Sequence, residues 1–338
     1  MKNEERKKIL LIATGGTIAS SAGLSGLSPS LSADELLAHC PGYEEFCTVR
    51  SVQPFNLDST NIGPEHWLKM AGIIEENYGG YDGFVITHGT DTMAYTAAAL
   101  SYLIQGSSKP VIITGAQKPI GFTSNDASIN LLDSLLFASD SRAHDVSIVF
   151  GGKAICGTRA KKEYSHSYNA FSSINYPVIA TISDGRIIFY IEDKQQGAKP
   201  RFYHDINSRV ALIKLIPGIS GSVLKDIGNH CDAVIIESFG LGGLPDYGTQ
   251  EFRKAVREFT AQGKTVVIAT QVTHEGSDMS IYQVGKEVKD ELSLHESFDM
   301  TLESTVVKTM WALANSASPE DFAKLFYTPV NHDLMWPV

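Results

Sequence analysis

Short apolar runs that end in glycine or a small polar residue recur along the chain, and they constrain its fold more than any other feature. These runs are KILLIATGG (8–16), GFVITHG (83–89), PVIITGAQ (110–117), DVSIVFGG (145–152), VALIKLIPG (210–218), AVIIESFG (233–240) and TVVIATQV (265–272). They are rich in valine and isoleucine and apolar on both faces, as parallel strands covered by helices on both sides are. The runs therefore predict an α/β fold built on mostly parallel sheets.

Helical patterns lie between several of these runs. Residues 64–78 have a proline at the expected first turn, residues 93–104 are rich in alanine, and residues 249–263 end in glycine. Residues 124–139 begin with Ser124 as the expected cap. Strands that alternate with helices predict right-handed crossover connections and a doubly wound sheet.

The alternation of strands and helices breaks at residues 178–191, which are expected to form a β-hairpin with Asp184 and Gly185 at its turn. The stretch that follows is polar and has no periodicity, as in a linker. The chain is therefore predicted to consist of a larger N-terminal, mostly parallel doubly wound domain (1–190), a linker (191–209) and a smaller C-terminal α/β domain (210–338).

Composition and charge argue against several classes of partner. The chain has 338 residues and a net charge of −10, which disfavours a nucleic acid or an anionic membrane surface. Its amino terminus is charged and then apolar for only a few residues, too few for a signal peptide. No window approaches the ~20 apolar residues of a membrane span. We therefore expect a cytoplasmic protein.

The cysteines Cys40, Cys47, Cys156 and Cys231 are widely spaced, and we interpret them as reduced thiols in a cytoplasm. His39 precedes Cys40, so a metal cluster with Cys47 is an alternative. The spacing matches no standard zinc pattern, and packing is the preferred interpretation.

Small polar residues gather at three expected strand ends: ATGGTIAS (13–20), THGTDT (87–92) and TGAQ (114–117). Ligands of open α/β sheets bind outside the carboxyl ends of the strands, so these ends predict a site rich in hydroxyls and backbone N–H groups. The first stretch lacks both the Walker and the dinucleotide-binding patterns. Thr17 within it is either a helix cap after a glycine turn or a hydroxyl presented to a ligand.

The stretch from His88 to Thr92 places five polar or small residues between a strand and a helix. One of Thr90, Asp91 and Thr92 is expected to cap the helix, but capping does not explain Thr90 and Asp91 together. A hydroxyl is a nucleophile only when a group such as lysine or carboxylate removes its proton. His88 is expected to be packed and hydrogen-bonded rather than a general base. The chain has neither a G-x-S-x-G elbow nor an H-E-x-x-H motif.

Two of these motifs, TGGTI (14–18) and HGTDTM (88–93), together resemble the active-site signatures of bacterial-type L-asparaginases. Further matches follow in the family's order: DSTNIGPEHW (58–67), KPVIITGAQKP (109–119) and GTRAKK (157–162). The resemblance covers nearly the whole chain and is greatest to the cytoplasmic, type I branch. It implies an amidohydrolase that converts L-asparagine to L-aspartate and ammonia through a threonyl acyl-enzyme.

The resemblance also implies the catalytic residues. Thr17 matches the nucleophilic threonine, which attacks the side-chain amide carbon of the substrate. Thr90, Asp91 and Lys162 match a second cluster, in which the lysine and the aspartate help a threonine hydroxyl to activate the nucleophile or water. The resemblance implies no metal and no organic cofactor.

The substrate-binding residues are implied in the same way. Ser59 and Thr60 match positions that hold the α-carboxylate of the amino acid, and Asp91 faces its α-ammonium group. Ala116 lies where a backbone carbonyl touches the substrate. Backbone N–H groups of Gly89 and of the glycines before Thr17 are expected to donate to the developing oxyanion.

The chain departs from the family in the loop after the first threonine. Residues 19–37 contain no tyrosine, whereas relatives have one there that contacts the nucleophile. Leu24 or Leu27 lies near that place, and Tyr43 is too far along the chain. The loop is rich in glycine and serine, as in a lid that closes on substrate.

A second departure is SFGLGGLP (238–245), where Gly243 occupies the position of an asparagine that reaches the neighbouring subunit's pocket in relatives. Glu275 and Asp278 are alternative contributors across an interface, although exposed loop acids are more often solvated. A homodimer or a homotetramer is expected from the resemblance.

Three other functions remain as alternatives. The first is a broader asparaginase-glutaminase, because one methylene changes binding by only ~1–3 kcal/mol. The second is the amidase subunit of a tRNA-dependent amidotransferase, which would bring a further N-terminal domain, whereas the first strand here begins by residue 8. The third is a non-catalytic amino-acid sensor, which the missing tyrosine keeps open.

Overall fold

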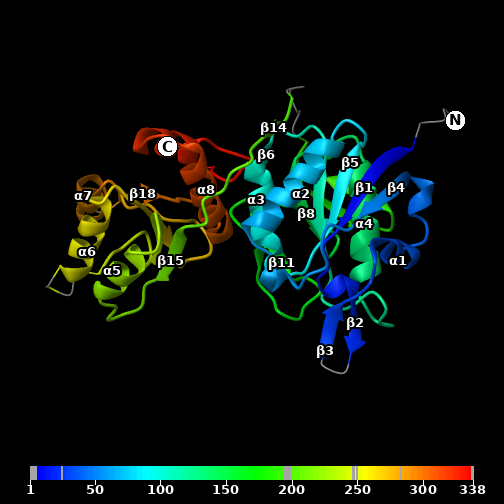
Figure 1. The fold of residues 1–338 in the computed structure, drawn as a ribbon, viewed down its shortest axis with the longest axis horizontal. Helices are drawn as coiled ribbons and strands as arrows, with labels where there is room; N and C mark the ends of the chain where they lie inside the picture. The colour runs from blue at the N-terminus through cyan, green and yellow to red at the C-terminus, as the bar shows by residue number, and fades with distance from the viewer. Residues whose placement is uncertain are drawn as a thin grey trace. The chain divides into compact units, whose positions relative to one another are not determined.

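A computed structural model describes residues 6–23, 26–192, 199–245, 248, 250–281 and 283–335. The chain forms two compact units, Met1–His204 and Asp205–Val338. Each unit is an α/β structure around a sheet of its own, and the first is the larger (Figure 1). The predicted fold class is therefore confirmed.

An eight-stranded sheet in the order β13-β12-β9-β8-β7-β5-β1-β4 forms the centre of the first unit. Its strands are β1 (Lys7–Ala13), β4 (Cys47–Val52), β5 (Gly83–Thr87), β7 (Val111–Thr114), β8 (Val146–Phe150), β9 (Lys153–Cys156), β12 (Ala180–Ser183) and β13 (Arg186–Phe189). The five neighbouring strands β4, β1, β5, β7 and β8 pair in parallel. The other three strands, β9, β12 and β13, pair antiparallel with their neighbours. β5, β7 and β8 are buried along their whole length, which is why the sequence shows them as continuous apolar runs.

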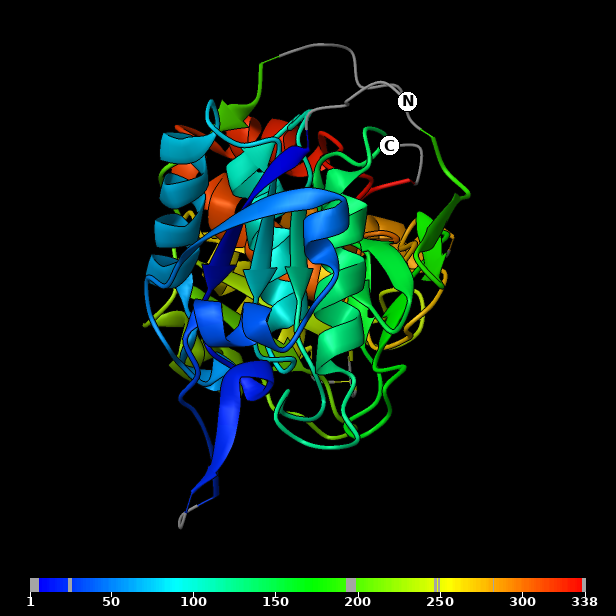
Figure 2. The same cartoon turned by 90° about the vertical axis from the view of Figure 1, so that its right-hand side faces the viewer.

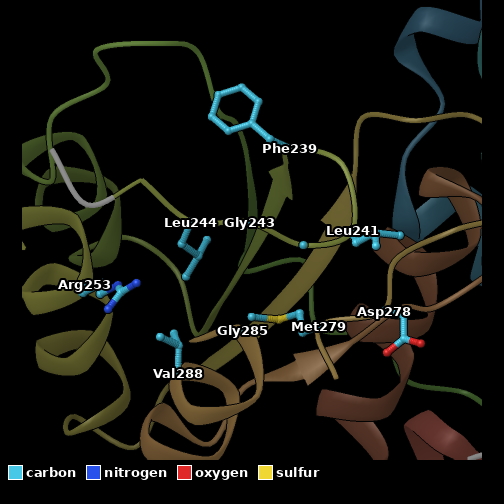
Figure 3. A pocket seen from close by; sticks show the side chains of 10 residues that line it. Phe239, Leu241, Gly243, Leu244, Arg253, Asp278, Met279, Gly285 and Val288 are labelled. Atoms are coloured by element: carbon cyan, nitrogen blue, oxygen red, sulfur yellow. The ribbon is translucent and has the colours of Figure 1, made fainter. Parts of the chain in front are cut away.

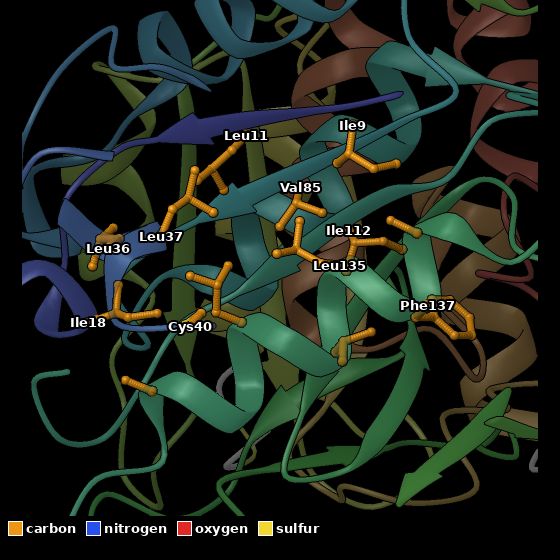
Figure 4. Packing of buried hydrophobic residues seen from close by; sticks show 14 of the residues in the cluster. Ile9, Leu11, Ile18, Leu36, Leu37, Cys40, Val85, Ile112, Leu135 and Phe137 are labelled. Atoms are coloured by element: carbon orange, nitrogen blue, oxygen red, sulfur yellow. The ribbon is translucent and has the colours of Figure 1, made fainter. Parts of the chain in front are cut away.

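Helices cover both faces of this sheet. α1 (Ala33–Ala38) and α4 (Ala127–Ser139) lie on one face, in front of the strands in Figure 2, and α2 (Pro64–Asn77) and α3 (Met93–Leu103) lie on the other (Figures 1 and 2). On the first face Leu11, Val85 and Ile112 from the sheet pack with Leu36 of α1 and Leu135 of α4 (Figure 4). This burial of apolar side chains on both faces fixes the positions of the strand ends.

Shorter elements complete the first unit, and they lie at the ends and edges of the sheet. They are η1 (Thr17–Ala19), β2 (Ser20–Gly23), β3 (Gly26–Pro29), η2 (Tyr43–Glu45), η3 (Ser59–Asn61), β6 (Ile104–Gln105), β10 (Ala160–Lys162), β11 (Phe171–Ser173) and β14 (Arg201–Phe202). Antiparallel pairs join β2 to β3, β10 to β11, and β6 to β14.

The predicted cap of α4 is wrong. The helix begins at Ala127 rather than at Ser124, and Asp126 occupies the N-cap position without a side-chain cap bond. The carboxylate of Asp126 instead accepts the backbone N–H groups of Gln117 and Lys118, at 2.9–3.1 Å. A tertiary contact has therefore taken the oxygen that a cap would have used.

The predicted hairpin is present, with Asp184 at φ 50° and Gly185 at φ 69° in the turn between β12 and β13. The predicted linker differs from the structure, because β14 inside it pairs with β6 and belongs to the first unit, which ends at His204. This segment joins the first unit because its aromatic side chains pack there: Phe202 lies edge-on against Tyr78 with ring centroids 5.7 Å apart, and Tyr203 is buried. Residues 193–198 of the predicted linker lie outside the described residues.

The second unit contains a parallel sheet in the order β15-β16-β17-β18. Its strands are β15 (Val210–Lys214), β16 (Ala233–Ser238), β17 (Thr265–Thr270) and β18 (His295–Glu296), and its helices are α5 (Ser222–Gly228), α6 (Glu251–Thr260), α7 (Gln283–Leu292), α8 (Leu302–Asn315) and α9 (Pro319–Tyr327). Its apolar core joins the sheet to α5, α6 and α7, with Val234, Leu224, Phe259 and Val288 among its members.

All four cysteines are buried and unpaired. Cys40 packs in the core cluster beside α1 and α4. Burial raises the pKa of Cys40 to about 12 and that of Cys47 to about 11, so both are neutral thiols at neutral pH. Their place in the core supports packing as their role.

His295 in the second unit makes folding stability depend on pH. It lies among the rings of Phe322, Phe326 and Tyr327, and burial, helped by the charge of Lys289, lowers its pKa to about 4. The unfolded chain therefore takes up a proton below pH ~6.5 that the folded chain does not, so stability falls as the pH falls toward 4.

The lowered pKa of His295 can reduce the free energy of unfolding at acidic pH by at most about 3 kcal/mol. We expect the free energy of unfolding, measured by urea denaturation, to fall less between pH 7 and pH 4.5 in His295→Phe than in the parent protein. The exposed His166→Phe is the matched control and is expected to follow the parent. Equal pH dependence in His295→Phe and the parent would contradict the prediction.

Candidate active site

Three strands of the first sheet end in one row. Ala13 of β1 is paired with Thr87 of β5, and Thr87 is paired with Thr114 of β7. Because these strands are parallel, the segments that follow them leave the sheet at the same level. The sequence predicts this convergence of the threonine-rich strand ends, and the register confirms it.

The first and second motifs touch through two glycines. A Cβ built on Gly16 would lie 2.3 Å from the backbone N of Gly89, and one on Gly89 would lie 2.6 Å from Oγ of Ser59. Gly16 also donates its N–H to the carbonyl of Leu57 at 2.9 Å. The segments that carry Thr17 and Thr90 thus meet backbone to backbone, and the Ser59 side chain lies directly on Gly89, approaches that only residues without side chains permit.

Replacing Gly16 by alanine is expected to lower the free energy of unfolding by more than about 2 kcal/mol, because the new Cβ meets the Gly89 backbone in addition to the strain of φ 78°. Gly42→Ala is the matched control, since Gly42 has φ 103° but nothing within 4 Å of its Cβ position. Urea denaturation of both variants separates the two effects. Equal losses in the two variants would show that the contact with Gly89 is unimportant.

The carboxylate-binding candidates lie on η3. Ser59 is buried, and Thr60 is exposed and donates its hydroxyl proton to Oδ1 of Asp58 at 2.7 Å. Asp58 also accepts the Thr60 N–H at 2.9 Å, and these two bonds hold the pKa of its carboxyl below the usual range. Asp58 is a positioning group that sequence analysis missed, although an aspartate before a helical turn is a familiar capping signal.

Lys162 joins the second cluster from the edge strand β10. Its Nζ lies 2.8 Å from Oγ1 of Thr90 and 2.6 Å from Oδ1 of Asp91. Thr90 is 5% exposed, whereas the Asp91 side chain is 59% exposed. Lys162 lies more than 70 residues from Thr90 and Asp91 along the chain, and the structure brings the three predicted residues into one hydrogen-bonded cluster.

The Thr90 hydroxyl has a further neighbour that sequence analysis missed. It donates to Oε1 of Gln117 at 3.4 Å, and the Gln117 amide nitrogen donates to the carbonyls of Tyr164 and Ser167. Gln117 is the last residue of the motif TGAQ (114–117) at the end of β7. This position is the sequence signal from which its place in the site could have been predicted. It connects Thr90 to the segment that follows Lys162.

Ala116 is fully buried in the loop that follows β7, and the residues around it are pinned to α4. Asn130 donates to the carbonyl of Gly115 at 3.0 Å, and Asp126 accepts the N–H of Gln117. The loop that carries the Ala116 carbonyl is therefore held on both sides.

The second motif supplies the N-cap residue of α3, as expected, but no side chain of the motif caps the helix. Thr92 occupies the N-cap position of α3 but makes no side-chain cap bond, and its hydroxyl donates to the Ser59 carbonyl at 2.7 Å. Thr17 lies one residue beyond the N-cap position of η1, which Gly16 occupies, so it is not a cap either. The hydroxyls of both motifs are thus free of local capping, and that of Thr92 makes a tertiary bond.

His88 is packed and hydrogen-bonded, as predicted. It is fully buried, with Nδ1 2.7 Å from the Gly89 carbonyl and Nε2 2.9 Å from Oγ1 of Thr96. Burial lowers its pKa to about 4, so the ring is neutral at neutral pH.

The loop after Thr17 forms the β2–β3 hairpin rather than an irregular segment (Figures 1 and 2). Leu24 lies outside the described residues, and the side chain of Leu27 is likewise not described. Tyr43 lies in η2, and its ring packs against the core cluster beside α1 and α4.

In the second unit, Gly243 and Asp278 line a cavity of about 270 Å³ together with apolar side chains of Phe239, Leu241 and Met279 (Figure 3). Asp278 accepts the Ser280 N–H at 3.0 Å. The cavity lies outside the predicted site of the first unit.

Comparison with known families agrees with these motifs. The family model described as "Asparaginase, N-terminal" matches residues 8–195, and "Glutaminase/Asparaginase C-terminal domain" matches residues 209–326. The chain therefore belongs to the asparaginase family. Among the described residues, none of the helices has the length and apolar character that crossing a membrane requires.

Individual relatives cover nearly the whole chain. An L-asparaginase of Thermococcus kodakarensis is 37% identical over 94% of this chain and 96% of its own. A solved structure of the thermostable L-asparaginase from that organism has a TM-score of 0.91, 35% identity, and coverage of 98% and 100% of the two chains. One subunit of the glutamyl-tRNA(Gln) amidotransferase of Pyrococcus abyssi is 32% identical, and the match covers 95% of this chain and 75% of that relative.

Proposed function

We propose that the protein hydrolyses L-asparagine to L-aspartate and ammonia through a threonyl acyl-enzyme. The observation that carries the proposal is the cluster in which Lys162 Nζ lies 2.8 Å from Thr90 Oγ1 and 2.6 Å from Asp91 Oδ1. An amide is a poor electrophile, so its hydrolysis needs a hydroxyl nucleophile and groups that move protons to and from it. The segment that carries Thr17 lies against this cluster through Gly16 and Gly89.

In the first step the hydroxyl of Thr17 adds to the side-chain amide carbon of asparagine. The C–N bond then breaks, the leaving nitrogen takes the proton that the Thr17 hydroxyl gave up and departs as ammonia, and an ester to Thr17 remains. In the second step water adds to that ester, and Thr90, with Lys162 and Asp91 beside it, takes the proton of the water. The bond between the acyl carbon and the Thr17 oxygen then breaks, that oxygen takes the proton, and L-aspartate leaves. The reaction as proposed needs no metal or organic cofactor.

The substrate is proposed to bind as an amino-acid zwitterion. Ser59 and Thr60 hold its α-carboxylate, Asp91 faces its α-ammonium group, and the Ala116 carbonyl accepts from the substrate. The exposure of the Asp91 carboxylate supports this, because Lys162 occupies only one of its oxygens. Backbone N–H groups, that of Gly89 among them, donate to the oxyanion.

We also propose that the protein acts in the cytoplasm as a homodimer or homotetramer. The buried, unpaired cysteines support the compartment. Exposed apolar side chains in the second unit, among them Val272 and Ile281, support association. Light scattering on the purified protein distinguishes monomer, dimer and tetramer.

The test of the activity is ammonia release from the purified protein over concentration series of L-asparagine and L-glutamine. A higher kcat/KM for asparagine supports the proposal, and comparable values for the two amides indicate an asparaginase-glutaminase. Binding of asparagine without ammonia release would identify a sensor of the same fold and overturn the enzymatic function.

A further inference from the structure

A chain of hydrogen bonds runs beneath the second motif, entirely in the interior of the first unit. Trp67 Nε1 donates to Thr96 Oγ1 at 3.0 Å, and this hydroxyl lies 2.9 Å from His88 Nε2. His88 Nδ1 lies 2.7 Å from the Gly89 carbonyl. Trp67 is 5% exposed, and Thr96 and His88 are fully buried, so water does not compete for these bonds.

The chemistry of its two ends determines the direction of every bond in this chain. An indole N–H can only donate and a carbonyl can only accept. His88 must therefore carry its proton on Nδ1 and accept on Nε2, where the single hydroxyl proton of Thr96 points. A neutral imidazole satisfies this arrangement, and the deep burial of His88, which lowers its pKa to about 4, keeps the ring neutral.

The bond from His88 fixes a peptide plane in the candidate active site. The Gly89 carbonyl and the Thr90 N–H belong to the same trans peptide, so they point in opposite directions. Because the carbonyl points to the buried imidazole, the Thr90 N–H points away from it. Within the described residues the Thr90 N–H has no hydrogen-bond acceptor, although Thr90 is only 5% exposed.

A buried N–H group without a partner is rare and calls for an explanation. Two constraints keep this one in place. Gly16 packs on the backbone N of Gly89 from one side, and His88 itself is tied to the neighbouring strand by its N–H bond of 2.8 Å to the Thr114 carbonyl. The peptide cannot rotate to find an acceptor without breaking these contacts.

We propose that His88 is a positioning residue, which with Thr96 and Trp67 holds the Gly89–Thr90 peptide so that the Thr90 N–H donates to the oxyanion formed when Thr17 adds to the amide. The inference rests on the proposed hydrolysis. His88 touches neither substrate nor nucleophile in this scheme. It acts by keeping a donor oriented before the charge develops, which is the source of the energy in preorganised sites.

The test compares two replacements of His88. His88→Phe keeps the ring but removes the Nδ1–H donor, and His88→Asn keeps an amide N–H close to the place of Nδ1. We expect His88→Phe to lower kcat for asparagine on the order of 10²-fold with KM changed little, since the oxyanion exists only in the transition state. His88→Asn is expected to recover most of that loss.

A third variant and a matched control replace buried threonines. Thr96→Val removes the hydroxyl that His88 accepts from and is expected to lower kcat several-fold. The control, Thr309→Val, removes a buried helical hydroxyl of the second unit, which donates to the Thr305 carbonyl, and is expected to leave kcat unchanged. Melting temperatures of all variants separate loss of fold from loss of orientation.

A spectroscopic measurement tests the arrangement without relying on turnover. Nitrogen NMR of the ¹⁵N-histidine-labelled parent is expected to show His88 at pH 7 as the neutral tautomer with its proton on Nδ1. A proton on Nε2 would overturn the inference, as would His88→Phe with the kcat of the parent or equal losses in His88→Phe and His88→Asn. If His88→Phe does not fold, an unchanged kcat in Thr96→Val overturns it. Absence of ammonia release from the parent is a failure of the proposed function itself, and it is seen before any variant is compared.

Discussion

Thr17→Ala is expected to lower kcat for asparagine hydrolysis by at least about 10³-fold, because the alanine variant lacks the hydroxyl that forms the acyl-enzyme. Loss of a nucleophile removes the covalent route and leaves only the contribution of binding and of oxyanion donors. Ammonia release under saturating asparagine measures the effect. The fold is expected to persist, because the neighbouring backbone contact is made by Gly16 and not by the Thr17 side chain.

Two other variants make this experiment decisive. Thr17→Ser retains a hydroxyl and is expected to keep part of the activity. Thr48→Ala removes an exposed threonine of β4 and is expected to match the parent. Mass spectrometry after acid quenching is expected to find an aspartyl adduct on the Thr17 peptide of the parent. Full activity in Thr17→Ala, or an adduct on another residue, would assign the nucleophile elsewhere.

Lys162→Met is expected to lower kcat by about 10²–10⁴-fold, the usual range for loss of a group that assists proton transfer. The methionine keeps most of the side-chain volume but makes neither the bond to Thr90 nor that to Asp91. The Thr90 hydroxyl then loses the group beside it that accepts or supplies protons. Steady-state ammonia release gives kcat and KM separately.

Lys161→Met is the matched control, since Lys161 is the preceding residue on β10 and its side chain points to the other side of that strand. It is expected to leave kcat within a few-fold of the parent. If Lys161→Met and Lys162→Met lose activity equally, the effect comes from disturbance of β10 and not from the lost amine. A parent-like kcat in Lys162→Met would remove the lysine from the mechanism.

The parallel strands are predictable because each is buried on both faces, and such burial leaves a continuous apolar run in the sequence. The runs that form β1, β5 and β7 show this pattern, and the polar residues at their ends stand out against it. The β12–β13 hairpin is equally clear, because Asp184 and Gly185 both adopt the positive φ that such a turn requires.

Local rules fail where a side chain has both a local and a distant partner. Ser124 and Thr92 have the character of helix caps, but α4 begins three residues after Ser124 and Thr92 binds the Ser59 carbonyl. β14 has the composition of a linker, because two aromatic residues in a polar segment give no periodic signal. For Thr92 the tertiary bond outweighs a capping preference of about 1 kcal/mol, and for β14 the pairing with β6 and the packing of Phe202 on Tyr78 decide the structure.

The sequence by itself determined the α/β class, the strand ends that carry the threonine motifs, and the family, since these depend on patterns local to each segment. Only the tertiary structure decided which of the polar residues meet. Sequence gives no distance between Lys162 and Thr90, and no indication that His88, Thr96 and Trp67 form a single chain of bonds. Such contacts join segments that come together only when the sheet and its covering helices are packed, so their geometry is a property of the folded chain.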